Sequence, residues 1–403
     1  MLYVLAAVSV AATLLLIKVL CSLGLTPCLS NNGRFKSIDG IRGFLALAVF
    51  FHHALITYHW KLSGEWEAPP NHVYENFGSV GVGIFFMITG FLFIGKLSSG
   101  RKVNWIRLYE SRLFRIVPLY LFALTAISLT VLVKTEFSLS VSRSQLSFDY
   151  LKWFLFHGGE INDFNDTKKI IAGVDWTLRY EWLFYLSLPL VALIMRCGVL
   201  AFSAFGLIIF TLFLLPLNIL TFDTSYLIYF FIGGCVSLIQ KRSEPKRSKP
   251  SPIKHDLLAL LLIAYAVAIA APLSLTQIGT LGCFFYLIAN GSSLFKLLHL
   301  PTARVLGEIS YSIYLLHGLV LYLCFSLLFS IPAVWDAQRF MLLLPLLSII
   351  VVILAIVTFK LIEAPGISLG KAGHLEKWLI KRLGKKNQTA NKPLGVDGVT
   401  TKL

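Results

Sequence analysis

The sequence predicts an all-α integral membrane protein with about eleven transmembrane helices. Of its 403 residues, 57% are hydrophobic and 14% are charged, and the mean hydropathy is +0.76. A soluble domain contains about 25% charged residues, and a chain this apolar has too little polar surface to enclose its core in water. Apolar runs of bilayer length, about 20 residues in a helix, also recur along the chain.

These apolar runs define the expected spans. We expect them at residues 3–24, 41–60, 79–97, 112–134, 178–196, 199–217, 225–240, 257–273, 276–293, 309–331 and 340–363. The first run has the position of a secretory signal. It lacks a basic leading segment and carries Lys18 late in the apolar stretch, so we expect a retained helix.

Positive charge gives these spans an orientation. The formal net charge is +16, and with eleven spans the basic loops and the tail all fall on one side of the membrane. The basic residues are Arg34, Lys36, Arg101, Lys102, Arg107, Lys241, Arg242, Lys246, Arg247, Lys249, Lys254 and those of the tail from Lys371. The positive-inside rule makes this side cytoplasmic, with the N-terminus outside. Because the basic residues form no soluble face, we expect no nucleic-acid partner.

The remaining composition gives no sign of a metal site. The six cysteines lie scattered inside or beside apolar runs, without metal-ligand or redox spacing. Residues 243–254 form a Pro/Ser/Lys linker, and the chain after about 384 is polar. No stretch has the length of a separate soluble catalytic domain, so the chemistry is expected in or at the membrane.

Ionisable residues inside spans are functional candidates, because they are costly to bury in lipid. Arg42 and His53 are separated by about 1100° of helical rotation, close to three full turns, and by about 16 Å along the axis. They therefore share a helix face, while His52 points about 80° away from Arg42. A neutral imidazole can act as a general base, and a guanidinium suits phosphates. An Arg at the mouth and a deep His match a CoA-type donor. An anchoring Arg and a His bonded to a carbonyl form the structural alternative.

Six segments in order resemble motifs of the membrane acyltransferase-3 family. They are SIDGIRGFLALAVFFHH, GSVGVGIFFMITGFLF, RLYESRLFRIVPLY, DWTLRYEWLFYLSLPL, LGEISYSIYLLHGLV and FKLIEAP. Thr89 and Thr177 stand where the family usually has Ser. The resemblance divides the chain into an extra N-terminal helix at 1–30, an acyltransferase-3-like membrane domain of ten helices at 35–366 and a basic cytoplasmic tail at 367–403.

The resemblance implies roles for several residues. His53 would be the general base or a transient acyl carrier. The phosphates of an acyl-CoA donor, expected to be acetyl-CoA, would be held by Arg42, Arg112 and Arg115, and no cofactor would remain bound. Glu363 would pair with one of these arginines, with a solvated helix-end carboxylate as the alternative.

Further candidates have equally open roles. Glu181, expected near the outer end of the fifth span with Trp176, would orient His53 or bind the acceptor; a structural ion pair is the alternative. Tyr314 and His317 are three residues apart and share a face, so they would line a cavity or lie in the core. Asp39, His52, Trp176 and Glu363 are further possible cavity-lining residues. The outer loop 149–169 mixes aromatic and acidic residues, which suits either sugar binding or an interfacial aromatic belt.

We therefore expect a multi-pass O-acyltransferase of a bacterial inner membrane. Its acceptor would be a hydroxyl of a cell-surface polysaccharide, such as lipopolysaccharide O-antigen, or of a lipid-linked glycan precursor. The alternatives are a transporter or acyl-group channel, a non-catalytic organiser of glycan assembly, or an acyltransferase for a small molecule or lipid. The sequence leaves the oligomeric state open.

Overall fold

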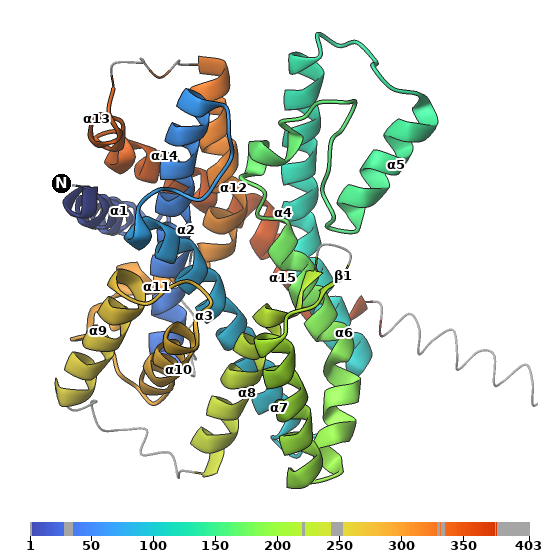
Figure 1. The fold of residues 1–403 in the computed structure, drawn as a ribbon, viewed down its shortest axis with the longest axis vertical. Helices are drawn as coiled ribbons and strands as arrows, with labels where there is room; N and C mark the ends of the chain where they lie inside the picture. The colour runs from blue at the N-terminus through green and yellow to red at the C-terminus, as the bar shows by residue number, and fades with distance from the viewer. Residues whose placement is uncertain are drawn as a thin grey trace, which may run out of the picture.

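The computed structural model describes residues 2–27, 35–219, 222–242, 253–328, 331, 335–374 and 376. Within these residues the protein is a bundle of helices with one two-residue hairpin (Figure 1). The helices are α1 (Leu2–Ser22), α2 (Lys36–Ser63), α3 (His72–Leu97), α4 (Trp105–Lys134), α5 (Arg143–Phe154), α6 (Trp176–Arg196), α7 (Val199–Leu214), α8 (Leu227–Arg242), α9 (Ile253–Ala268), α10 (Leu275–Ala289), α11 (Pro301–Glu308), α12 (Ser310–Leu323), α13 (Ala337–Met341), α14 (Leu344–Thr358) and α15 (Ala364–Ala372).

Shorter elements connect these helices. The 3-10 turns are η1 (Thr167–Ile171), η2 (Thr224–Tyr226) and η3 (Leu297–His299). The π-helical turns are η4 (Cys324–Leu328), which extends α12, and η5 (Phe359–Glu363), which joins α14 to α15. Strands β1 (Asn218–Ile219) and β2 (Phe222–Asp223) pair antiparallel.

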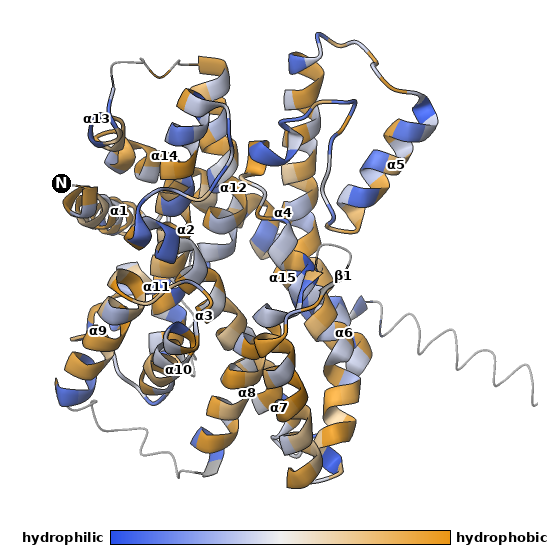
Figure 2. Ribbon diagram, viewed as in Figure 1, coloured by the Kyte–Doolittle hydropathy of each residue, from blue (hydrophilic) through white to orange (hydrophobic). Residues whose placement is uncertain are grey.

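The predicted all-α membrane fold is confirmed. Each of the eleven predicted apolar segments contains a helix, and among the described residues seven helices are long and apolar enough to cross a bilayer. Helices α7 and α10 are shorter and equally apolar. Orange, apolar residues dominate α6, α7 and α8, whereas α5 carries blue, polar residues along much of its length (Figure 2). The sequence analysis missed α5, α11 and α13, because none of them has a bilayer-length apolar run.

Side-chain caps explain where several of the helices begin. The Asn71 side chain accepts a hydrogen bond from Tyr74 N at 3.2 Å before α3. Asn104 accepts from Arg107 N at 3.1 Å before α4. Such a cap satisfies one of the N–H groups that a helix leaves unpaired in its first turn. The spans therefore begin several residues before the apolar runs that predict them.

The basic loops meet at one end of the bundle. Asn104, at the start of α4, donates to Glu376 Oε1 at 2.6 Å in the chain after α15. Lys241, at the end of α8, donates to the carbonyl of Ser98, which follows α3. The predicted cytoplasmic loops are thus neighbours in space, as alternating spans require.

The opposite end gathers the loops predicted outside. Tyr58, near the end of α2, donates to Trp335 O at 2.9 Å, and Lys134, at the end of α4, donates to Ser326 O at 2.8 Å. Helices α5 and α13 lie at this same end, at the top of the view (Figure 1). The grouping of the loops agrees with the predicted alternation of eleven spans.

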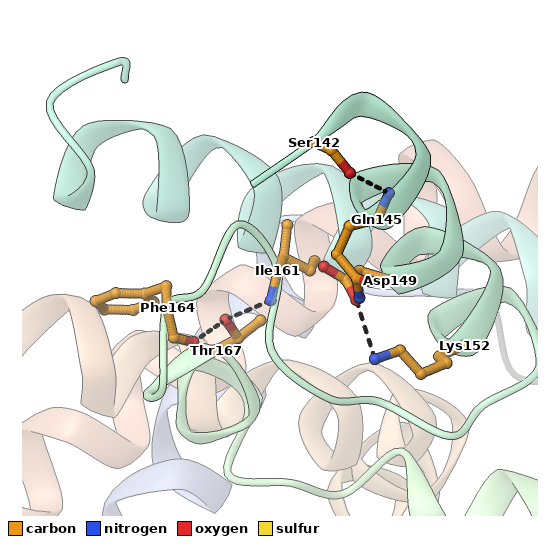
Figure 3. Close-up of polar contacts among 7 residues, drawn as sticks. All are labelled: Ser142, Gln145, Asp149, Lys152, Ile161, Phe164 and Thr167. Carbon is orange, nitrogen blue, oxygen red and sulfur yellow. Dashed lines mark hydrogen bonds and ion pairs between the residues drawn. The ribbon is translucent and has the colours of Figure 1, made fainter. Parts of the chain in front are cut away.

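The segment that contains α5 has its own polar framework (Figure 3). Ser142 caps α5 by accepting from Gln145 N at 3.2 Å, and Asp149 accepts from Gln145 Nε2 at 2.8 Å and pairs with Lys152 at 3.0 Å. Behind α5, Thr167 Oγ1 accepts from the Ile161 backbone and donates to the Phe164 carbonyl. These bonds hold the outer loop in a defined shape without an apolar core of its own.

Glycines bring two pairs of helices into close contact. A Cβ added at Gly90 of α3 would overlap Phe230 O of α8, and one added at Gly233 of α8 would overlap Met87 O of α3. Close approach through small residues is how membrane helices gain packing energy without a hydrophobic drive between them. Helices α2 and α11 approach in the same way at Gly307, which lies against the Asp39 carbonyl. Helix α2 is thereby fixed beside α12, which follows α11 directly.

Candidate active site

A cavity lies between α2, α3, α4, α6 and α12, and three arginines line it. They are Arg42 of α2 and Arg112 and Arg115 of α4. Its other polar lining residues are Thr89, Thr177, Glu181, Tyr185, Ser310, Tyr311 and Tyr314, and its walls are aromatic and aliphatic. The three predicted donor-binding arginines therefore share one space, although they come from two helices far apart in sequence.

The arginines keep donors free to bind a ligand. No ion pair within 4.0 Å engages Arg42, Arg112 or Arg115 in the described part of the chain. The Arg112 guanidinium carbon lies 5.3 Å from the centre of the Phe93 ring, and its buried Nε has no hydrogen-bond partner. The Tyr185 hydroxyl interacts with the Arg112 guanidinium. A cluster of guanidinium groups without ion-pair partners in a low-polarity cavity attracts an anion such as a phosphate.

Glu181 belongs to this arginine cavity rather than to the histidines. Its Oε2 accepts a hydrogen bond from Tyr185 at 3.0 Å, and the positive charges of Arg112, Arg115 and Arg42 act on it. The hydrogen-bond partners that the structure gives His53 do not include Glu181. The structure therefore places Glu181 where it balances the arginine charges, at their depth in the bundle.

Glu363 lies in the protein interior and does not line the cavity. It has no exposed surface, and its Oε2 accepts from Ser312 Oγ at 3.0 Å while its Oε1 has no partner. Arg115 and Arg42 are the cations whose charges act on it. Of the two sequence-based alternatives, burial favours the arginine partner over a carboxylate solvated at a helix end. Asp39 does not line the cavity, and of the cations Arg42 acts on it most strongly.

His53 forms a pair with His317 of α12. His317 Nε2 lies 3.1 Å from His53 Nδ1, and the two rings are 5.0 Å apart. His53 Nδ1 is also 3.0 Å from Val49 O, one turn back along α2, and His317 Nδ1 is 3.2 Å from Ile313 O. The structure thus brings together two histidines that are 264 positions apart in the sequence.

Tyr314 connects the histidine pair to the arginine cavity. Its ring lies 6.3 Å from His317 one turn along α12, and its hydroxyl is 3.0 Å from Thr177 Oγ1 of α6. Tyr314 lines the cavity together with Arg42. Helix α12 therefore faces both Arg42 and His53, as their shared face on α2 requires.

Two candidates lie beside the site without entering it. His52 turns toward α3, where its Nδ1 is 2.8 Å from Tyr74 O. Trp176 packs at the start of α6 in an aromatic cluster with Phe86, Tyr180 and Tyr226, and it does not line the cavity. Both are placed as structural supports for α2 and α6.

Trp66, which the sequence did not single out, stacks on His53 from the loop between α2 and α3. Their ring centres are 6.4 Å apart at an interplanar angle of 23°. Trp60 lies 5.4 Å from Trp66, and Lys61 Nζ lies 3.8 Å from the Trp60 ring. No periodic signal marks Trp66, because it lies in the loop between α2 and α3.

The fold and the site define a class. A multi-pass helical membrane protein with an arginine-lined cavity and, beside the Tyr314 of that cavity, a pair of histidines has the parts of a membrane-embedded group transferase. Comparison with known proteins identifies the family: a family model described as an acyltransferase domain matches residues 35–360, and the chain belongs to this acyltransferase-3 family. The predicted enzyme class is thereby confirmed.

Curated relatives agree with this membership. The chain is 23% identical over 313 residues to the O-acetyltransferase OatA of Staphylococcus aureus (strain NCTC 8325 / PS 47), covering 70% of this chain and 49% of the relative. It is 25% identical over 325 residues to the "Putative peptidoglycan O-acetyltransferase YrhL" of Bacillus subtilis (strain 168), covering 70% and 47%. The chain spans about half the length of these curated relatives. No solved structure gives a significant match.

Proposed function

We propose that this protein transfers an acetyl group from cytoplasmic acetyl-CoA to a hydroxyl of a cell-surface polysaccharide. The observation that supports this most is the continuity of the site. Arg42, Arg112 and Arg115 line one cavity, Tyr314 lines the same cavity, and Tyr314 lies one turn from His317, which contacts His53. A CoA donor has anionic phosphates at one end and a thioester at the other, which suits this arrangement.

In the proposed reaction, His53 moves a single proton. The acceptor hydroxyl gives its proton to His53 Nε2 while its oxygen forms a bond to the acyl carbonyl carbon. The carbon–sulfur bond then breaks, and the departing thiolate takes the proton from His53. The products are an ester and free CoA, so His53 returns to its neutral state. Direct transfer is the simplest form of this chemistry, and an acyl-histidine intermediate would be its two-step variant.

The acceptor is expected to approach from the end that carries Trp66. The relatives' names favour a glycan acceptor, and one of those names specifies peptidoglycan. We propose a bacterial inner membrane location with a periplasmic N-terminus and a cytoplasmic tail, based on the basic loops. Peptidoglycan, lipopolysaccharide O-antigen and lipid-linked glycan precursors all present hydroxyl groups on the required side.

The decisive experiment compares two histidines of α2. A host lacking its own copy would express wild type, His53→Ala or His59→Ala at matched levels, and mass spectrometry would measure ester-linked acetate on isolated peptidoglycan and lipopolysaccharide. His59 is the control, since it lies near the end of α2 and its ring contact is with Tyr58, outside the site. We expect esters with wild type and His59→Ala and none with His53→Ala. Full acetylation by His53→Ala would refute the assignment of the base.

The donor is tested separately at Arg42. In inverted membrane vesicles supplied with labelled acetyl-CoA, Arg42→Ala should raise the KM for acetyl-CoA, because a phosphate contact worth about 1.5–3 kcal/mol is lost. Arg101→Ala is the control, because Arg101 is exposed in the loop before α4. An unchanged KM in Arg42→Ala would contradict phosphate binding by this residue.

A further inference from the structure

Two backbone carbonyls, those of Val49 and Ile313, determine which ring nitrogens of the histidine pair carry hydrogen. A carbonyl oxygen only accepts hydrogen bonds, so a ring nitrogen close to it must carry hydrogen. His317 Nδ1 is 3.2 Å from Ile313 O, and it therefore carries the ring hydrogen of neutral His317. Its Nε2 is then an acceptor, and this is the atom 3.1 Å from His53.

The ring of His53 also has one nitrogen beside a backbone carbonyl. Its Nδ1 is 3.0 Å from Val49 O, so this nitrogen also carries hydrogen. In the opposite tautomer, the lone pair of His53 Nδ1 would face both the Val49 carbonyl oxygen and the lone pair of His317 Nε2, and both contacts would be repulsive. The two assignments are compatible. The hydrogen on His53 Nδ1 is the one hydrogen between the rings, and both Val49 O and His317 Nε2 accept it. His53 Nε2 is left unprotonated.

The free nitrogen is the one that a base needs. His53 is only partly buried, and within the described residues the hydrogen bonds of its ring all involve Nδ1. Its Nε2 thus remains available beside Trp66, on the side of the outer loop. His317, in contrast, has no exposed surface, and Phe50 and Tyr314 flank its ring at 6.2 and 6.3 Å. His53, the proposed base, is therefore paired with His317, whose ring is enclosed by the protein.

We propose that His317 is a positioning residue that fixes His53 in the Nδ1–H tautomer and stabilises it after it takes the acceptor's proton. This inference rests on the proposed function. When His53 Nε2 gains the hydroxyl proton, the ring becomes a cation and its Nδ1–H bond to His317 becomes charge-assisted, and hence stronger. In serine hydrolases a buried carboxylate performs this task for the catalytic histidine. Here a neutral imidazole occupies that place, which avoids burying a further charge in the membrane.

Two substitutions separate hydrogen bonding from packing at position 317. His317→Phe keeps a planar ring without an acceptor, whereas His317→Gln offers an amide oxygen to His53 Nδ1–H. Initial rates would be measured in inverted vesicles with labelled acetyl-CoA. We expect His317→Phe to lower kcat by about 10²-fold, the lower range for proton-transfer groups, with the KM for acetyl-CoA unchanged. His317→Gln should recover about tenfold of this loss, since an amide acceptor restores one hydrogen bond. Wild-type kcat in His317→Phe, or equal losses in both variants, would overturn the proposal.

A second measurement does not depend on the folding of any variant of His317. Nitrogen-15 NMR of the wild-type protein with labelled histidine reports which ring nitrogens carry hydrogen, and the His53→Ala spectrum identifies the His53 signals. We expect protonated Nδ1 and unprotonated Nε2. Protonated Nε2 in the resting protein would overturn the proposal.

The two proposals fail in different ways. If His53→Ala retains full acetylation, the catalytic assignment fails, whatever the tautomer. If His53→Ala is inactive while His317→Phe is fully active, the catalytic assignment stands and the positioning role is wrong.

Discussion

Replacing Gly318 by alanine tests whether the histidine pair needs the close approach of α12 to η1. Gly318 follows His317 directly on α12. A Cβ added there would overlap the backbone of Ile171 and Ala172, at the end of η1 in the outer loop. Because this contact involves backbone, no side-chain rotation relieves it, and α12 must move away from η1 together with His317.

The size of the displacement follows from the contact distances. The added Cβ would lie 2.8 Å from the Ala172 Cβ, whereas two carbon atoms prefer a separation of about 3.5–4.0 Å. The difference is about 0.7–1.2 Å, and the Ile171 carbonyl carbon and the Ala172 nitrogen lie closer still, so α12 must shift by at least about 1 Å. A misplacement of about 1 Å at a catalytic centre lowers the rate by about 10²-fold. Overpacking costs about 1–3 kcal/mol, partly offset by about 1 kcal/mol of improved helix propensity.

The assay combines two measurements on the purified protein and its vesicles. Initial rates with acetyl-CoA report kcat and KM, and thermal unfolding in detergent reports stability. Gly279→Ala of α10 is the matched control, because it is also a helical glycine and no atom lies within 4 Å of its added Cβ. We expect Gly279→Ala to keep full activity and to be slightly more stable than wild type. Full activity in Gly318→Ala would refute the reasoning that α12 is held in place by this contact.

Three further predictions concern stability. Burial raises the pKa of the Asp175 carboxyl, just before α6, to about 7, above an unfolded value of about 3.9. The folded protein therefore binds this proton more tightly, so its free energy of unfolding falls as pH rises from about 4 to about 7. Asp175→Asn should flatten this dependence in pH-resolved melting curves, and an unchanged slope would contradict it. Asp256→Ala removes the acceptor of four hydrogen bonds from residues 292–295, which should cost about 3 kcal/mol, and equal melting temperatures of mutant and wild type would argue against this. Gln277→Leu removes the donor to Asn76 Oδ1 at 2.7 Å between α10 and α3, and denaturant unfolding should show a loss of about 1–3 kcal/mol; an unchanged midpoint would show that this bond is dispensable.

Much of the architecture was accessible from local sequence, because a bilayer imposes a length on each apolar run. The segments around Arg42 and His53 were predicted to form a helix with both side chains on one face, and α2 has both facing α12. Loop charges predicted which ends lie together, and the contact between Asn104 and Glu376 agrees. Helix α5 was missed, because its polar framework carries no bilayer-length apolar signal.

Pairing between helices was decided by the tertiary structure. The sequence left Glu181 between orienting His53, binding the acceptor and a structural ion pair with an arginine, and the structure places it in the arginine cavity, bonded to Tyr185. It left His317 between cavity lining and core, and only the packing of α12 on α2 sets its Nε2 against His53.

The sequence by itself therefore determined the apolar spans, their alternation and the faces of single helices, because helical periodicity and bilayer thickness act within one segment. The depth and rotation of one helix relative to another depend on contacts such as those of Gly90 and Gly318, where backbone meets backbone. Those contacts join residues far apart in the chain, so only the folded bundle shows that Tyr314 lies between the arginine cavity and the histidine pair.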